Sequence, residues 1–260
     1  MPPRSLSSLA AVALVALVAS PATAQAGLYL TTGFERASYD PGSLDLFTDT
    51  YNEYYVQRLD APFEYVDPSL VRPVFGVSFR YADGVYASGA YQFGRASQAR
   101  ASDLGAVDQR YDLTVTDHTV LTELGFETGP VYVAGVVGGV FRSETIDYRT
   151  VYADGSESRG NELLPTGRYT GTTPYLDAGV AVGLTVGRVV VPVRVTVPVV
   201  SFGGVPMSDP DLSAFRTYFP ADWDRYLEDG GGLDDGNAVH DDAFMGMRVT
   251  VGVELRLFPL

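Results

Sequence analysis

The stretch GRVVVPVRVTVPVV, residues 187–200, decides the fold class of this chain. Every odd position from Val189 to Val199 is valine, whereas the even positions include Arg194 and Thr196. Side chains two residues apart share one face of a β-strand, so the stretch predicts a strand with one aliphatic face and one partly polar face. Soluble sheets also alternate, so the class depends on how often the pattern recurs and how the strands are connected.

The same alternation recurs in seven other stretches, so the sequence predicts eight strands in all. The other stretches are residues 28–35, 71–81, 85–94, 114–126, 131–142, 174–185 and 244–257. Polar segments without alternation are predicted to be loops at 38–70, 95–112, 143–172 and 201–243. The remaining connections are predicted tight turns at Asp83-Gly84, Thr128-Gly129-Pro130 and Gly187-Arg188.

Long and short connections therefore alternate along the predicted sheet. A sheet that passes up and down through a membrane places all odd connections on one side and all even connections on the other. Bacterial barrels combine short periplasmic turns with long external loops, whereas a soluble barrel has no reason to sort its loops by parity. The pattern predicts an all-β fold: an eight-stranded antiparallel up-and-down transmembrane β-barrel with short periplasmic turns and long extracellular loops.

The beginning of the chain resembles a secretory signal peptide. Residues 1–24 contain Arg4, the apolar core Leu9–Val18 and the small-residue cleavage site Ala22-Thr23-Ala24. This leaves residues 25–260 as a single barrel domain, exported through the Sec signal to the outer membrane of a two-membrane bacterium. The chain has no cysteine, so disulfides do not contribute to its stability.

Charged residues on the mixed strand faces are expected to meet inside the barrel. Eight strands enclose an interior just wide enough for side chains, and a buried charge without a partner is costly, so pairing is expected. A strand pairing about Val186-Gly187 places Thr196 opposite Asp177, with Arg194 diagonal to it. The predicted lumen charge network comprises Arg72, Arg80, Glu123, Asp177, Arg194, Arg248, Glu254 and Arg256.

Two alternatives to a closed lumen stay open at this point. A small porin-like diffusion channel would use the same charged lumen as a path. A soluble periplasmic lipocalin-like lipid binder would turn the aliphatic faces inward instead. Large aliphatic side chains from every strand would crowd a narrow lumen, so the membrane barrel is favoured.

The eight alternating stretches and the alternating C-terminal residues 250–258 carry a family resemblance. The chain resembles the small eight-stranded outer-membrane barrels, the OmpA/OmpX-type transmembrane domains, over roughly residues 26–258. The resemblance is one of pattern and includes no fixed motif. It implies outer-membrane lipids as surroundings and the barrel-assembly machinery as a partner during biogenesis.

The predicted function is structural or surface-binding, through loops 38–70 and 201–243 and an extracellular ligand of unspecified chemistry. The net charge of −14 argues against nucleic acid as a partner. We expect a monomer with no cofactor and no catalytic residues: Val120 follows His118 where a His-x-Ser deacylase motif needs serine. His240-Asp241-Asp242 is interpreted as a polar loop end.

The last loop contains two further candidates. Aromatic residues at spacings of three to four predict a short amphipathic helix or a lid over the barrel mouth, with loop-on-loop packing as the alternative. This possible extracellular binding surface comprises Phe215, Tyr218, Phe219, Trp223 and Tyr226. Oxygen ligands that suit Ca²⁺ are weak metal candidates, because EF-hand spacing is absent and a solvated loop explains them. They are Asp234, Asp235, Asn237, Asp241 and Asp242.

Overall fold

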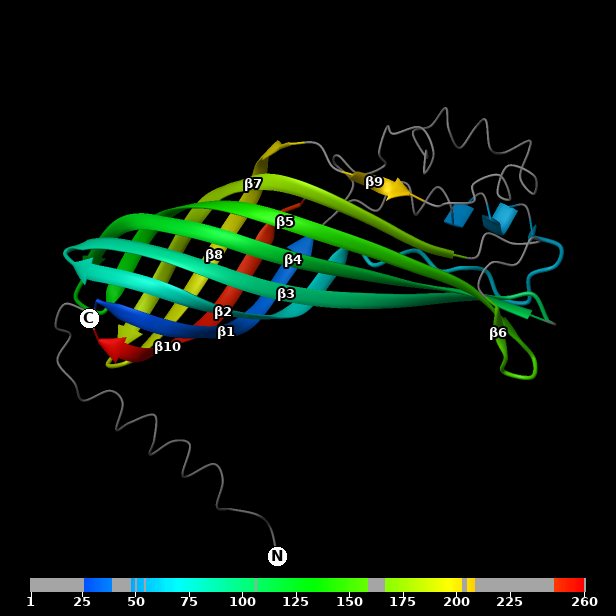
Figure 1. The fold of residues 1–260 in the computed structure, drawn as a ribbon, viewed down its shortest axis with the longest axis horizontal. Coiled ribbons are helices and arrows are strands. Elements are labelled where there is room, and N and C mark those ends of the chain that lie inside the picture. The colour runs from blue at the N-terminus through cyan, green and yellow to red at the C-terminus, as the bar shows by residue number, and fades with distance from the viewer. Residues whose placement is uncertain are drawn as a thin grey trace, which may run out of the picture.

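The chain folds into a long antiparallel sheet that closes on itself (Figure 1). The computed structural model describes residues 26–38, 48–49, 51–53, 55–105, 107–158, 167–202, 205–208 and 246–259. Its strands are β1 Gly27–Ser38, β2 Ser69–Asp83, β3 Val85–Asp103, β4 Val107–Thr128, β5 Val131–Tyr152, β6 Glu157–Ser158, β7 Gly167–Val186, β8 Val189–Ser201, β9 Val205–Ser208 and β10 Arg248–Pro259. Within these ranges, no helix is long and apolar enough to cross a bilayer.

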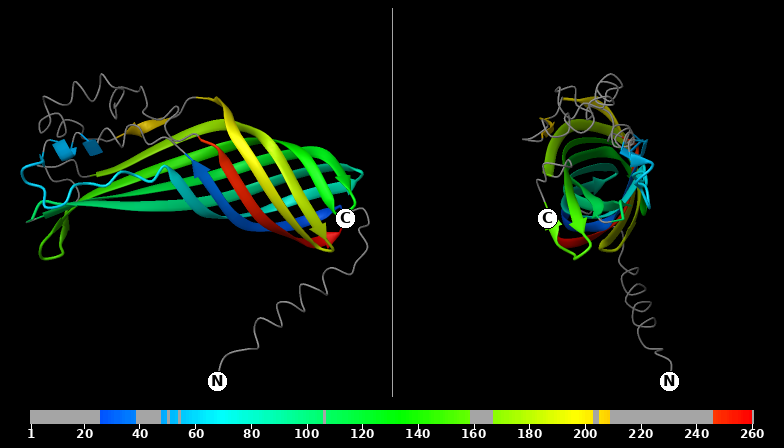
Figure 2. Two further views of the ribbon diagram at one scale, coloured as in Figure 1. Left: turned by 180° about the vertical axis from the view of Figure 1, so that it is seen from behind. Right: turned by 90° about the vertical axis from the view of Figure 1, so that its right-hand side faces the viewer.

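Eight of these strands form a closed ring in the order β1, β2, β3, β4, β5, β7, β8 and β10. The ring closes where β10 pairs with β1, from Gly27↔Pro259 to Ala37↔Arg248. The short strands β6 and β9 are additions at the edges of β5 and β7. The end-on view in Figure 2 shows the ring directly. The predicted eight-stranded antiparallel barrel is confirmed.

The aliphatic faces of the strands point outward. Leu124 and Val133 are 64% and 55% exposed, whereas their lumen-facing neighbours Glu123 and Tyr132 are completely buried. Val193 and Val197 are exposed in the same way, and Arg194 between them is buried. A soluble barrel would place the aliphatic row inside. The lipocalin-like alternative is therefore wrong, because the lumen carries the ionic row.

Four strands are much longer than the sequence predicts. The expected loops at 95–112 and 143–172 are wrong, since β3, β4, β5 and β7 continue through most of them. Pairing runs on from Arg95↔Thr116 to Asp103↔Asp108, so only three residues connect β3 to β4. The strict alternation of long and short connections fails there. In these extensions the apolar row is the buried one: Tyr111, Leu113 and Val115 of β4 are buried and alternate with the outward-facing Asp112, Thr114 and Thr116. The outward aliphatic row by which the lipid-facing strands are recognised is absent there.

We call this extension the arm: residues 95–103, 107–116, 143–152 and 167–173. Figure 1 shows the arm continuing well past the ends of β1, β2, β8 and β10. One wall of the barrel thus ends at the rim, and the opposite wall projects beyond it. The concave face of the arm continues the lumen face, and the convex face continues the lipid-facing surface.

The concave face of the arm carries its own small core. A docked segment, described at residues 48–49, 51–53 and 55–68, lies on this face. The Phe63 ring lies 4.8 Å from Tyr51, 5.3 Å from Tyr111 and 6.1 Å from Tyr148, measured between ring centroids. The Asn52 side chain brackets the Phe63 backbone, donating to its carbonyl at 3.0 Å and accepting from its amide at 2.9 Å. Burial raises the pKa of the Tyr51 hydroxyl above its usual range.

The docked segment also covers the edge of β3 beyond the end of β2. The Gln98 side chain donates to the Asp67 carbonyl at 3.1 Å and accepts from the Asp67 amide at 3.0 Å. Arg100 donates to the Tyr65 carbonyl at 2.8 Å, and Ala61 forms a β-bridge with Asp103. The unpaired N–H and C=O groups of an uncovered strand edge can pair with another chain. These bonds cover that edge of the arm.

The two prolines of β8 differ in their effect on the register. A bulge places Leu176 opposite Val200 but Asp177 opposite Pro198, so Val199 is the extra residue beside that proline. At Pro192, which has no N–H to donate, the register of β8 is regular.

The three short turns each contain a glycine with positive φ, a conformation that other residues rarely adopt. These are Gly84 at 72°, Gly129 at 58° and Gly187 at 60°.

Candidate functional site

Six charged side chains form an alternating chain across the lumen near the rim. In order they are Arg142, Asp117, Arg72, Glu35, Arg248 and Asp177. We call this the outer cluster; it contains three arginines and three carboxylates. Each member is at most 5% exposed, so the low dielectric strengthens every pair and makes a missing partner costly.

The strand register brings the outer cluster together. Asp117 lies directly opposite Arg142, whose Nε and Nη2 both donate to its carboxylate at 2.9 Å. Arg72 lies opposite Glu35 and also reaches Asp117 on the second strand away. It crosses β3 at Gly94, where a Cβ atom would lie 3.1 Å from the Arg72 Nε. The glycine leaves the space that this guanidinium needs.

Arg248 completes the outer cluster from β10. Its Nη2 donates to Glu35 at 2.7 Å, and its Nη1 donates to Asp177 at 2.7 Å. Hydroxyls fill the remaining positions: Thr250 donates to Glu35 and Thr196 donates to Asp177, each at 3.2 Å. Five of the eight barrel strands thus contribute a charged member besides β10 itself: β1, β2, β4, β5 and β7.

A second group, the inner cluster, lies toward the short turns and comprises Arg80, Glu254, Arg194 and Glu123. Arg194 pairs with Glu123 and also donates to Glu254 at 2.7 Å. Arg80 donates to Glu254 at 3.1 Å. The two arginines match the two carboxylates, so this cluster is balanced as well.

Tyrosines seal the inner cluster at the short-turn end. The guanidinium of Arg80 lies 4.8 Å and 4.7 Å from the ring centroids of Tyr86 and Tyr132, which stack on each other at 4.1 Å. Such cation–π contacts add to the pairing where the cation is desolvated. The Tyr86 hydroxyl donates to Glu123 at 2.5 Å. Gly183 makes room for the Tyr132 ring, since a Cβ there would lie 2.0 Å from Cε1.

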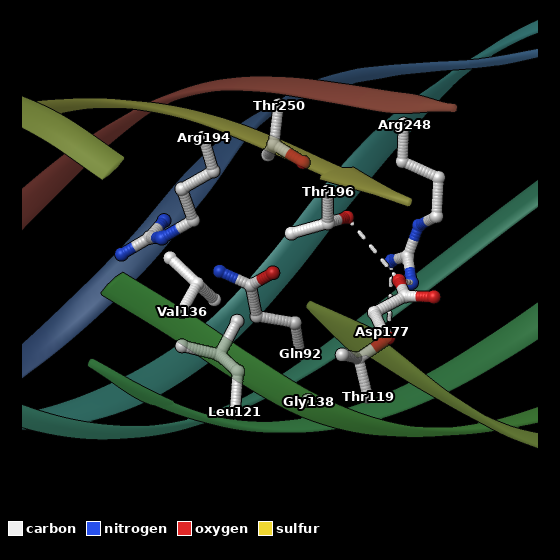
Figure 3. A pocket seen from close by; sticks show the side chains of 10 residues that line it. All are labelled: Gln92, Thr119, Leu121, Val136, Gly138, Asp177, Arg194, Thr196, Arg248 and Thr250. Atoms are coloured by element: carbon white, nitrogen blue, oxygen red, sulfur yellow. Dashed lines mark hydrogen bonds and ion pairs between the residues drawn. The ribbon is translucent and has the colours of Figure 1, made fainter. Parts of the chain in front are cut away.

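Between the two clusters lies a small polar cavity (Figure 3). Its volume is about 10 Å³, room for roughly one water molecule. Gln92, Asp177, Arg194 and Arg248 face it, and each keeps one polar atom without a partner among the described residues. The described part of the lumen thus carries ionic groups, and the aliphatic side chains lie outside.

That combination decides the class. The chain is an eight-stranded antiparallel β-barrel of the transmembrane kind. The hydrocarbon core of a bilayer contains no water, and lipid tails cannot form hydrogen bonds with free backbone N–H and C=O groups. A closed ring of strands leaves no such unpaired edge in the hydrocarbon. The outward band of valine, leucine and phenylalanine suits acyl chains.

No protein-family model and no curated protein matches the sequence of this barrel. Among solved structures it is similar to two crystal structures of Ail, the attachment invasion locus protein of Yersinia pestis. One, in complex with the heparin analogue sucrose octasulfate, has 7% sequence identity and a TM-score of 0.39. The other has 8% identity and the same TM-score, and each alignment covers 90% of this chain and 99% of Ail.

The barrel brings most of the predicted lumen charges together. Seven of the eight predicted residues belong to the two clusters. Arg256 does not: it is half-buried opposite Tyr29, near the short-turn end, and forms no ion pair with another described residue. The predicted pairing about Val186-Gly187 is wrong by two residues. Thr196 lies opposite Gly179, although its hydroxyl still donates to Asp177, and the ion-pair partner of Asp177 is Arg248.

Glu35, Asp117 and Arg142 belong to the outer cluster but are absent from the predicted network. The predicted set contains five arginines and only three carboxylates, a net charge of +2 in a closed lumen. Since an unmatched buried charge is strongly destabilising, this imbalance signals missing carboxylates. Glu35 and Asp117 are two such carboxylates on the lumen face.

Other sequence candidates lie outside the described residues. These are the signal peptide at residues 1–24, the aromatic set Phe215, Tyr218, Phe219, Trp223 and Tyr226, the metal candidates Asp234, Asp235, Asn237, Asp241 and Asp242, and His240. In the part of the chain that the structure describes, no group of three or more histidine, aspartate or glutamate side chains is arranged to hold a metal ion.

Proposed function

We propose that this chain is a surface-binding outer-membrane barrel with a closed lumen, whose working surface is the arm together with the adjoining loops. One observation carries the proposal: half of the barrel wall continues beyond the lipid-facing band as an ordered, braced sheet. A barrel that serves only to span the membrane has no use for such an extension. Export through the Sec signal and insertion by the barrel-assembly machinery belong to the same proposal.

The balanced clusters support a closed lumen. An ion or solute could pass only by separating buried pairs, and each broken pair leaves a buried charge worth about 3–5 kcal/mol of destabilisation. The free space between the clusters is about one water molecule in size. We therefore expect no conductance steps for the folded protein in planar bilayers, and regular steps would favour the porin-like alternative.

The contacts that brace the arm support binding at its surface. Arg149 bridges Asp112 at 2.5 Å and Glu157 at 3.2 Å on the convex face. The aromatic core under the docked segment braces the concave face. A surface that is ordered before binding avoids the entropic cost of ordering on contact, which is a general route to affinity.

Single-cysteine labelling in cells tests the orientation that this function requires. Because the chain has no cysteine, Ala99→Cys on the arm and Thr128→Cys at the β4–β5 turn each introduce one thiol at an exposed position. A membrane-impermeant maleimide should label Ala99→Cys in intact cells and Thr128→Cys only after the outer membrane is permeabilised. Labelling of the turn but not the arm in intact cells would reject the proposal.

A further inference from the structure

The convex face of the arm presents two neighbouring rows of hydroxyl side chains. Strand register aligns Ser97, Thr114, Thr145 and Thr170 across four strands. The next row toward the membrane aligns Thr116, Ser143 and Thr172, with Arg95 at its β3 end. We call these seven hydroxyl residues the hydroxyl grid.

The hydroxyl grid is regular because a sheet makes it so. Neighbouring strands lie about 4.8 Å apart, and positions two apart on one strand are separated by about 6.6–6.8 Å. Ser97 and Thr114 are already in contact, with 2.9 Å between their oxygens. Each hydroxyl can both donate and accept. The grid therefore offers a flat array of paired donors and acceptors, with a single charge at its edge.

The position of the grid determines what it meets. The next row toward the barrel is Phe93, His118, Phe141 and Pro174, in the same register. The His118 ring lies 5.2 Å from Phe93, and its Nδ1 lies 2.7 Å from the Tyr91 hydroxyl. Phe141 and Val120 are 49% and 62% exposed on this face. Aromatic girdles of this kind mark the interface of a transmembrane barrel.

We propose that the hydroxyl grid binds the neutral sugars of the outer-leaflet glycolipid whose acyl chains pack on the band below it. The inference rests on the proposed function, because it requires the arm to project outward. The grid continues the lipid-facing surface on the same strands, so a lipid packed on that surface extends its headgroup across the grid. Sugar hydroxyls match an array in which every position both donates and accepts.

The charge pattern favours sugars over phosphates. Phosphate recognition relies on clustered arginine or lysine, and within the two grid rows Arg95 is the single charged residue. The row beyond the grid contains Asp112 and Asp147 with Arg168, a net charge of −1 that disfavours an anion. A neutral glycan has no such penalty.

A matched pair of variants tests the grid. Thr114, Thr116, Thr145 and Thr172 are all changed to Val in one variant and all to Ser in the other. Valine keeps the β-branched shape and removes the hydroxyl, whereas serine keeps the hydroxyl. The full-length barrel in detergent is titrated with lipopolysaccharide that carries core sugars and, separately, with lipid A alone. Both variants are first checked for a heat-modifiable band, which reports a folded barrel.

The wild-type protein should bind the core-bearing lipopolysaccharide about tenfold more tightly than lipid A. The valine variant should lose this preference and the serine variant should keep most of it. Equal affinity of the wild type for both lipids, or a preference that survives in the valine variant, would overturn the inference. A preference abolished by removing the core phosphates would assign binding to Arg95 instead and overturn it too.

The labelling experiment separates this failure from failure of the proposed function. If Ala99→Cys is labelled in intact cells and the valine variant still prefers core sugars, the arm is outside and the grid alone is misassigned. If the arm is not reached from outside, the proposed function fails whatever lipid the purified barrel prefers.

Discussion

Neutralising Asp117 should destabilise the barrel strongly, because this carboxylate joins two buried guanidiniums. It accepts two hydrogen bonds at 2.9 Å from Arg142 and a further one from Arg72. Arg72 keeps Glu35 as an ion-pair partner, whereas Arg142 loses its two-point ion pair with the Asp117 carboxylate. Removing one member of a buried pair costs about 3–5 kcal/mol, so we expect a loss of that size for Asp117→Asn.

The double variant distinguishes pairing from simple loss of packing. Asp117→Asn combined with Arg142→Gln leaves an alternating, neutral chain of Arg72, Glu35, Arg248 and Asp177. The double variant should therefore be more stable than the sum of the two single changes by about 1–3 kcal/mol. Asp108→Asn is the control, since this exposed aspartate near the arm tip should change stability by less than about 0.5 kcal/mol.

The measurement is the free energy of unfolding in urea, with the protein refolded into lipid vesicles and the heat-modifiable band as the folded signal. If Asp117→Asn is as stable as Asp108→Asn, the outer cluster does not hold the lumen as described. Strict additivity of the double variant would refute the coupling between Asp117 and Arg142, even if each single change is costly.

Three further outcomes follow from other parts of the barrel. Val195→Arg on the lipid side should lower the free energy of unfolding by about 2–4 kcal/mol near mid-membrane. Thr196→Val loses one hydrogen bond of 3.2 Å to Asp177 and should lower it by about 1 kcal/mol. Unfolding titrations in lipid vesicles compare the two variants. Gly183→Val should destabilise by about 1–3 kcal/mol, because its Cβ would lie 2.0 Å from the Tyr132 ring, and the same titration measures this. Burial raises the pKa of the Tyr51 hydroxyl in the folded protein. The contribution of this hydroxyl to the free energy of unfolding is therefore complete below its unfolded pKa of about 10 and falls as pH rises above that value. Proteolysis of the docked segment should accelerate above that pH in wild type and less in Tyr51→Phe.

The strands that lie in lipid were predictable because the bilayer imposes the pattern. Hydrocarbon requires an apolar side chain at every outward position, and the narrow lumen admits polar ones, so alternation is strict in β8 and β10. The arm faces no such demand. Ser97 and Thr114 are paired across β3 and β4 as regularly as Phe93 and His118, yet the outward positions of the arm are polar, and its apolar residues, such as Leu113 and Val115, face inward. A search for an outward aliphatic row therefore passes over these strands.

The error of two residues in the β7–β8 register has a local cause. The predicted pairing was counted about Val186-Gly187, although the tight turn predicted at Gly187-Arg188 is the one observed, with Val186 paired to Val189. From Val186 to Asp177 the register is constant, so the bulge beside Pro198, which begins only at Leu176, plays no part in this error.

Charge balance supplies information that alternation does not. Strand parity identified the lumen arginines Arg72, Arg194 and Arg248, because an arginine inside an apolar alternation is conspicuous. It did not identify Asp117, which lies close to the predicted start of its strand, among polar residues. A closed lumen of low dielectric must be close to neutral, so each buried arginine requires a carboxylate somewhere on the lumen face. Five arginines and five carboxylates in the two clusters meet this condition, and applying it to the lumen-facing positions of each strand would have selected Glu35 and Asp117 from sequence.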